Sequence, residues 1–123
     1  MSIEIPGRLI PLEASADLSA NQHRFLVVDA NGQVAVAGAG VLAVGVLQND
    51  PAAQGEAATV MLDGVSKVVA GAAVTSGAEV ASDASGRAVT AATGNRVNGI
   101  ALETCANAGE VIAVALLRGG QLN

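Results

Sequence analysis

The chain has almost no aromatic, cysteine or histidine residues, and each shortage excludes a class of structure or chemistry. Among its 123 residues, Phe25 is the only aromatic, Cys105 the only cysteine and His23 the only histidine. One cysteine cannot form an intramolecular disulfide, and one cysteine with one histidine cannot build an ordinary zinc site. A core without large rings must rely on small side chains, which bury less apolar area per residue. We therefore expect association with other subunits to supply part of the stability.

Basic residues are also few and scattered. Six Lys and Arg residues stand against eleven Asp and Glu residues, which leaves a net charge of −5. Without a basic stripe or a basic amphipathic helix, neither nucleic acid nor a membrane surface is an expected partner. The first residues lack the pattern of a signal peptide, and no apolar run approaches the roughly 18 residues that span a bilayer. We expect a soluble protein made in the cytoplasm of the cell that produces it.

The residues that carry catalytic chemistry do not form a recognisable constellation. His23 stands beside Arg24 without a G-x-S-x-G nucleophile elbow anywhere in the chain, and Cys105 has no basic neighbour that would lower its pKa. We expect a surface histidine and an inert cysteine. The glycine-rich stretch GAGVLAVG is followed by more strand pattern, whereas a dinucleotide loop should precede a helix. The carboxylates occur singly, mostly at expected turns: Asp29, Asp50, Asp63 and Asp83. The sequence therefore predicts no enzyme activity, no cofactor and no metal.

Short segments of β-branched or alternating residues dominate from Phe25 onward. They are separated by turn residues such as Asn31-Gly32 and Ser85-Gly86, where glycine accepts a positive φ. The segments read RFLVV, QVAVA, VLAVGVL, AATVML, VSKVVAG, AEVAS, RAVTA, RVNGIAL and EVIAVALL. This pattern predicts an all-β domain over residues 25–123.

One phrase occurs twice in the chain, 54 positions apart. AVGVLQNDPAAQGEAATVML matches VNGIALETCANAGEVIAVAL, with Gly45 against Gly99 and Gly55 against Gly109. The matching positions are turn glycines and strand residues, which fix backbone geometry. We expect two similar β units, at about residues 26–62 and 80–116, folded into a small barrel or sandwich with internal pseudo-symmetry. Within each copy, residues 50–55 and 104–109 are expected to form a single helical turn between two strands.

Residues 1–24 differ from the rest and are expected to form an N-terminal arm. Pro6 and Pro11 favour an extended path, and the apolar residues of the segment need a surface to cover them. Two interpretations stay open, a frayed terminus or an extended arm laid onto a partner. On the second, deleting residues 1–14 would weaken partner binding and leave the β fold intact. The predicted partner-binding residues are Ile3, Ile5, Leu9, Ile10 and Leu12.

Lys67 raises the alternative of a carrier domain. Lipoyl and biotinyl carrier domains place a modified lysine on a hairpin tip of a two-fold β fold. Here Ser66 and Val68 flank the lysine, and VSKVV has the pattern of a strand with the lysine facing solvent. A solvated strand lysine, which also discourages edge pairing, is the favoured interpretation.

The order and spacing of these features resemble the capsid cement, or head decoration, proteins of tailed bacteriophages. The resemblance covers about residues 16–117 and rests on the turn TSGAEV, the hairpin SDASGRAV, and GIALE followed by GEVIAVAL. It implies a small β-barrel or β-tulip-like domain that binds the outer surface of the mature phage head. It also implies a homotrimer that bridges neighbouring subunits of the major capsid protein and is synthesised in the bacterial host cytoplasm. Another virion component, a tail or fibre β module, is the alternative.

Overall fold

A computed structural model describes residues 5–121, with side chains described for residue 5 and residues 7–117. This part of the chain contains no helix, and so none that could cross a membrane. The all-β prediction is confirmed. The strands are β1 (Ile5–Pro6), β2 (Leu9–Glu13), β3 (Phe25–Val28), β4 (Val34–Val36), β5 (Gly45–Leu47), β6 (Ala57–Met61), β7 (Gly64–Val69), β8 (Glu79–Ser82), β9 (Ala88–Thr90), β10 (Arg96–Ala101) and β11 (Val111–Gln121).

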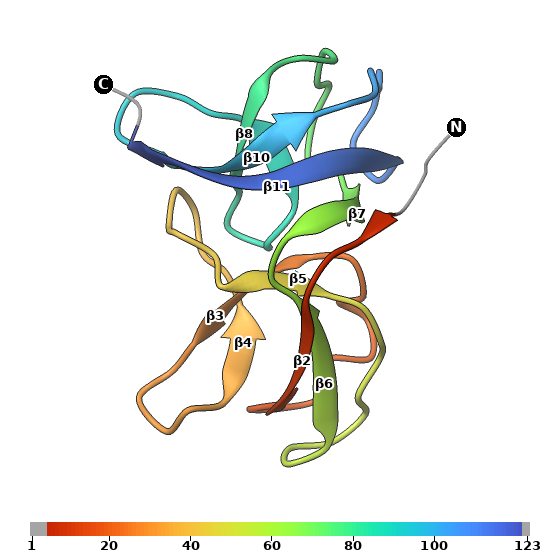
Figure 1. Cartoon of the computed structure of the whole chain (residues 1–123), viewed down its shortest axis with the longest axis vertical. Helices are drawn as coiled ribbons and strands as arrows, with labels where there is room; N and C mark the ends of the chain where they lie inside the picture. The colour runs from red at the N-terminus through yellow and green to blue at the C-terminus, as the bar shows by residue number, and fades with distance from the viewer. Residues whose placement is uncertain (1–4, 122–123) are drawn as a thin grey trace.

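The strands form two antiparallel sheets, which lie one above the other in Figure 1. The lower sheet has the order β2-β6-β5-β3-β4, and the upper sheet has the order β1-β7-β11-β10-β8-β9. Apart from β1, the two orders correspond strand for strand. We call β2 to β6 the first unit and β7 to β11 the second unit.

The registers show that the two units share one template. Val46 pairs with Met61 in the first unit, and Ile100 pairs with Ala115 at the positions 54 residues later. The equivalence also includes β2 and β7, which precede the ranges predicted from the sequence and lie 56 residues apart. The offset differs because the connection that follows β2 is two residues longer than the one that follows β7.

The repeated Gly-Glu pair closes a turn in each unit. Gly55 and Gly109 have φ values of 89° and 92°, a conformation that other residues rarely adopt. The carboxylates of Glu56 and Glu110 each accept a hydrogen bond from a backbone N–H of their own turn, at 2.7 and 2.9 Å. The repeated residues therefore specify the turn in each unit.

The helical turns predicted at residues 50–55 and 104–109 are wrong. Apart from an isolated bridge at Cys105, both segments are bends, turns and irregular backbone, and the N–H of the glycine in each bonds to a residue just after a distant strand. Gly55 donates its N–H to the carbonyl of Ala14, and Gly109 donates to the carbonyl of Ala70, both at 2.8 Å. A helix would require those N–H groups to bond to carbonyls one turn earlier in the same segment.

Gly45 and Gly99 occupy equivalent places where the backbone of a neighbouring strand comes close. A Cβ at Gly45 would collide with the carbonyl oxygen of Met61, and a Cβ at Gly99 with that of Ala115. Each contact lies between adjacent strands of the same sheet. The repeat therefore conserves glycine where no other side chain fits.

Each unit has a hydrophobic cluster built on seven equivalent positions. The N-terminal cluster contains Ala14, Leu18, Leu26, Val34, Leu47, Ala58 and Val60. The C-terminal cluster contains, at the same positions, Ala70, Val74, Val80, Ala88, Ala101, Ile112 and Val114.

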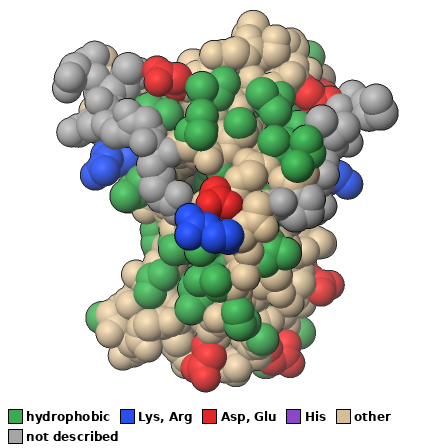
Figure 2. Space-filling model, viewed as in Figure 1, with side chains coloured by type: hydrophobic (Ala, Val, Ile, Leu, Met, Phe, Trp, Pro, Cys, Tyr) green, Lys and Arg blue, Asp and Glu red, His purple; other side chains and the backbone are tan. Residues whose placement is uncertain are grey.

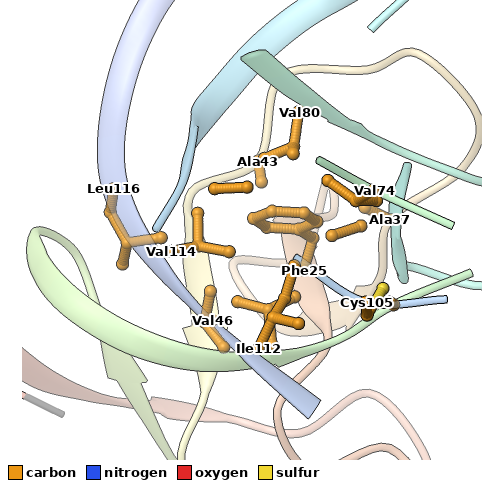
Figure 3. Close-up of a cluster of buried hydrophobic side chains, with 14 of the residues drawn as sticks. Phe25, Ala37, Ala43, Val46, Val74, Val80, Cys105, Ile112, Val114 and Leu116 are labelled. Carbon is orange, nitrogen blue, oxygen red and sulfur yellow. The ribbon is translucent and has the colours of Figure 1, made fainter. Parts of the chain in front are cut away.

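The two clusters are filled in different ways. Three leucines of the first unit, Leu18, Leu26 and Leu47, correspond to smaller residues in the second unit. Ile112 is larger than its counterpart Ala58, and the C-terminal cluster also contains residues of the first unit, among them Phe25, Val46 and Met61. Figure 3 shows the Phe25 ring surrounded by side chains of both units, including Val74, Val80, Ile112 and Val114. The single aromatic residue thus joins the two units.

The N-terminal segment is extended, but part of it belongs to a sheet. β2 pairs with β6 through five residue pairs, from Leu9 opposite Met61 to Glu13 opposite Ala57. Ala14 is a fully buried member of the N-terminal cluster. The strand pairing therefore places β2, which precedes the boundary predicted at residue 24, in the sheet of the first unit, and deletion of residues 1–14 is instead expected to disturb the β fold.

Candidate partner interface

The predicted partner-binding residues of the N-terminal segment do not lie on one surface. Ile3 lies outside the described residues. The side chains of Ile5 and Leu9 are exposed, at 58% and 46%. Ile10 and Leu12 are half-buried and pack against the N-terminal cluster. This division follows from the alternation of side chains along β2, which places Leu9 on one face and its neighbours Ile10 and Leu12 partly in the core.

Ile5 adds to an apolar row across the six-stranded sheet. It lies opposite Val65, which lies opposite Ala115, which lies opposite Ile100. Residues directly opposite in antiparallel strands point to the same face. Their neighbours Val114 and Ala101 are buried in the C-terminal cluster, so this row is on the other side of the sheet. We call that side the outer face.

Strand alternation and pairing assign residues of five strands to the outer face. Ile5 comes from β1, three residues come from β7, four from β11 and one from β10, with Leu102 just beyond β10, and Glu79 at the start of β8 lies opposite Ile100. Leu102 adjoins β11 because its N–H donates to the carbonyl of Ala113. We use the name for Ile5, Val65, Lys67, Val69, Glu79, Ile100, Leu102, Val111, Ala113, Ala115 and Leu117.

The outer face leaves large apolar side chains in contact with solvent. Leu102 is 45% exposed and Leu117 is 51% exposed, and Val111 is also exposed. Figure 2 shows hydrophobic side chains gathered over β11 and β7 in the upper half of the molecule, with a smaller group over β2 and β6 below. An apolar patch of this kind on a folded protein is typical of a contact surface.

The first unit provides an internal comparison for this surface. At four positions the outer face has an apolar residue where the first unit, with the same backbone, has a polar one. Three of those polar residues are half-buried, and Val46 and Met61 on the same face of the first unit are buried in the C-terminal cluster. The pairs are Val69 with Glu13, Ala113 with Thr59, Leu102 with Gln48 and Leu117 with Asp63.

Lys67 and Glu79 are charged members of the outer face. Lys67 lies in the middle of β7, opposite Ala113, and its side chain is half-buried. Because it is on a strand and away from any hairpin tip, it does not have the placement that carrier domains give their modified lysine. Its strand partner Ala113 and its neighbours on the same face of β7, Val65 and Val69, are apolar.

A second apolar patch lies on the first unit. Val28, Val41 and Leu42 are exposed there, and a shallow open groove runs between β3 and the segment before β5. The groove is lined by Val27, Val28, Leu42, Ala43 and Val44.

The turn carboxylates are engaged in holding the backbone. Oδ1 of Asp29 accepts N–H hydrogen bonds from Asn31 and Gln33 at 2.9 Å, and Oδ1 of Asp83 accepts the equivalent pair at 2.8 Å. The hydroxyl and the N–H of Ser19 lower the pKa of Asp17. Among the described residues, no group of three or more potential metal ligands is gathered in one place.

The histidine and the cysteine stand apart from these surfaces. His23 is half-buried and has a φ of 65°, at the position where the second unit has Gly77. Cys105 is buried, and its Sγ lies 3.4 Å from the carbonyl oxygen of Ala72.

Comparisons with known proteins agree with an all-β structural protein. The family model described as phage cement protein matches residues 7–116. Among solved structures, the chain is similar to the head fiber gp8.5 N base of bacteriophage phi29, with a TM-score of 0.72 and 16% sequence identity. That similarity covers 94% of this chain and 99% of the other, and at this identity it shows a shared fold. No curated protein matches the sequence.

Proposed function

The chain belongs to the phage cement protein family, and from this premise we propose that it decorates the outer surface of the mature phage head. The family match confirms the resemblance found in the sequence, and it makes the chain a structural protein of the phage virion. The proposal adds that each copy bridges neighbouring subunits of the major capsid protein. It also adds that the protein is a homotrimer made in the bacterial host cytoplasm.

The observation that carries the proposal is the family match over nearly the whole chain. Two features of the surface support a bridging role. Bridging requires two separate contact areas, and the structure has an apolar outer face on the second unit and an apolar patch on the first. Many weak contacts of this kind, repeated over a shell, hold it together through multivalency. The turn carboxylates are already bound to the backbone, which supports a role without catalysis.

The predicted arm residues take different roles in this proposal. Ile5 and Leu9 are exposed and are proposed to contact the capsid directly. Ile10 and Leu12 pack on the N-terminal cluster and are proposed to act by holding β2 in place. Ile3 is proposed to extend the contact.

Cosedimentation with phage heads tests the proposal. Purified protein is mixed with undecorated, expanded heads of the matching phage, and with unexpanded proheads as the control. Saturable binding to expanded heads alone is expected, and the bound fraction gives the number of copies per head. The absence of binding to expanded heads would overturn the proposal. Detection of only a few copies in purified virions would instead favour a tail or fibre component.

A further inference from the structure

We propose that Asn31-Gly32, at the tip of the β3–β4 hairpin, is a self-modification site. There Asn31 loses its side-chain amide as ammonia and becomes aspartate or isoaspartate. The reaction uses only water and the backbone of the protein itself. It is independent of the proposed decoration function.

The reaction begins at the backbone nitrogen of Gly32. This nitrogen gives up its proton to water and attacks Cγ of Asn31, which forms a C–N bond and closes a succinimide ring. The bond from Cγ to the side-chain nitrogen breaks, and that nitrogen leaves as ammonia. Water then opens the ring at one carbonyl to give aspartate, or at the other to give isoaspartate. Glycine favours the attack because it has no Cβ beside the nitrogen and its backbone turns freely.

The hairpin tip leaves both reacting residues accessible to water. Asn31 and Gly32 are exposed in the turn that joins β3 to β4, at the lower end of the molecule in Figure 1. A Cβ at Gly32 would meet no atom within 4 Å, so there is room around the attacking nitrogen. Its N–H donates to the carbonyl of Asp29 at 3.1 Å, a hydrogen bond that an exposed turn opens at low cost. No hydrogen bond to the side chain of Asn31 is found among the described residues.

The fold protects the other Asn-Gly pair of the chain, Asn98-Gly99. Asn98 is 5% exposed, and its Oδ1 accepts the N–H of Ala43 at 3.0 Å while its Nδ2 donates to the carbonyl of Val41 at 3.1 Å. Gly99 lies in β10, which is paired on both sides. Reaction at this pair must therefore wait for a local opening of the sheet.

Conversion changes both the charge and the shape of the hairpin. Either product carries a carboxylate, which adds a negative charge to a chain whose net charge is −5. Isoaspartate also lengthens the backbone within the turn, where Oδ1 of Asp29 accepts the N–H groups of Asn31 and Gln33 at 2.9 Å. Because β4 begins at Val34, a buried member of the N-terminal cluster, we expect the longer turn to loosen the hairpin.

Incubation of the folded protein in mildly alkaline buffer, followed by peptide mass spectrometry, tests the proposal. We expect release of ammonia and conversion at Asn31, with Asn98 reacting at least about tenfold more slowly. In urea that unfolds the chain, both pairs should react at similar rates. Asn31→Ser is the matched variant, because it copies Ser85 of the equivalent hairpin and has no amide to lose. It should stay folded in a thermal melt and release no ammonia over the period in which the parent converts.

Two results would overturn the inference. If Asn31 stays intact in the folded protein while it converts in urea, the turn prevents the reaction. If Asn31 and Asn98 convert equally fast in the folded protein, the fold does not select the site. Hydrogen exchange of the isoaspartate fraction tests the structural consequence. Faster exchange in β3 and β4 than in the unmodified protein is expected, and equal exchange would show that the hairpin is not loosened.

Discussion

At the scale of single residues, the phrase written twice in this chain specifies backbone shape. Gly55 and Gly109 adopt a positive φ, and the glutamate after each accepts an N–H of the same turn. His23 shows the same backbone requirement in a residue other than glycine. Its φ is 65°, at the position where the second unit has Gly77. The template demands a left-handed backbone at this point, whichever residue occupies it.

Gly77→Ala is expected to lower the free energy of unfolding by about 1 kcal/mol. A Cβ at Gly77 would meet no atom within 4 Å, so the cost comes from its φ of 88° alone. Gly38→Ala is the matched control, because that position is equally open and does not have a positive φ. The control is expected to leave stability unchanged or to raise it by about 0.4–1 kcal/mol. Chemical denaturation of both variants measures the difference, and equal stabilities would contradict the prediction.

The sequence shows which glycines are repeated, but it only partly shows why glycine is needed at each position. Turn chemistry predicted a positive φ after Asn31 and after Ser85, where Gly32 and Gly86 have φ values of 77° and 76°. The close approach of Gly45 to the carbonyl of Met61 could not be predicted, because it depends on which strands become neighbours. Spacing along the chain does not reveal a contact between strands.

At the scale of elements, alternation and turn residues predicted strands correctly and helical turns wrongly. Residues 50–55 have helix-start and helix-stop residues, Asp50, Pro51 and Gly55. The N–H of Gly55 instead bonds to Ala14, which is 41 positions earlier in the chain. A long-range hydrogen bond of this kind prevailed over local preference, and only the assembled sheet supplies it.

Phe25, a residue of β3 in the first unit, packs in the C-terminal cluster, and we expect the stability of the second unit to depend on it. Phe25→Ala is expected to lower the free energy of unfolding by about 3–5 kcal/mol, because it leaves a cavity in the C-terminal cluster. Since the ring lies among residues of β8 and β11, native-state hydrogen exchange should lose protection mainly in the second unit.

Leu26→Ala is the control for Phe25→Ala. Leu26 is the next residue of β3 and is equally buried, but it belongs to the N-terminal cluster. Its replacement should reduce protection mainly in β2, β5 and β6. If both variants lose protection in the same strands, the two clusters are not separate and the account of how each unit is filled is wrong.

At the scale of the whole molecule, the two units share one strand order but differ in how their hydrophobic clusters are filled. The first unit fills its cluster with leucines and inserts Phe25 into the second, and the second unit presents an apolar outer face to the outside. The repeat was readable from the sequence because it preserves glycines. The outer face was not identified, because its residues come from strands far apart in the sequence and only the strand pairing brings them together.

The N-terminal segment gives the last prediction at this scale. Deleting residues 1–14 removes β2, uncovers β6 and takes Ile10, Leu12 and Ala14 from the N-terminal cluster. Each large apolar side chain that is lost contributes about 1.5–3 kcal/mol when fully buried, against a total stability of roughly 5–15 kcal/mol. The truncated protein is therefore expected to melt at a much lower temperature or to remain unfolded.

Deleting only residues 1–4 is the control, because every contact described for β1 and β2 is made by residue 5 or later. This shorter deletion is expected to keep the melting temperature of the parent, and circular dichroism with a thermal melt compares the three proteins. Loss of head binding by the longer deletion then reports loss of the fold, whereas loss by the shorter one reports a direct contact. A longer deletion that melts like the parent would show that β2 is an arm after all and that the first unit is complete without it.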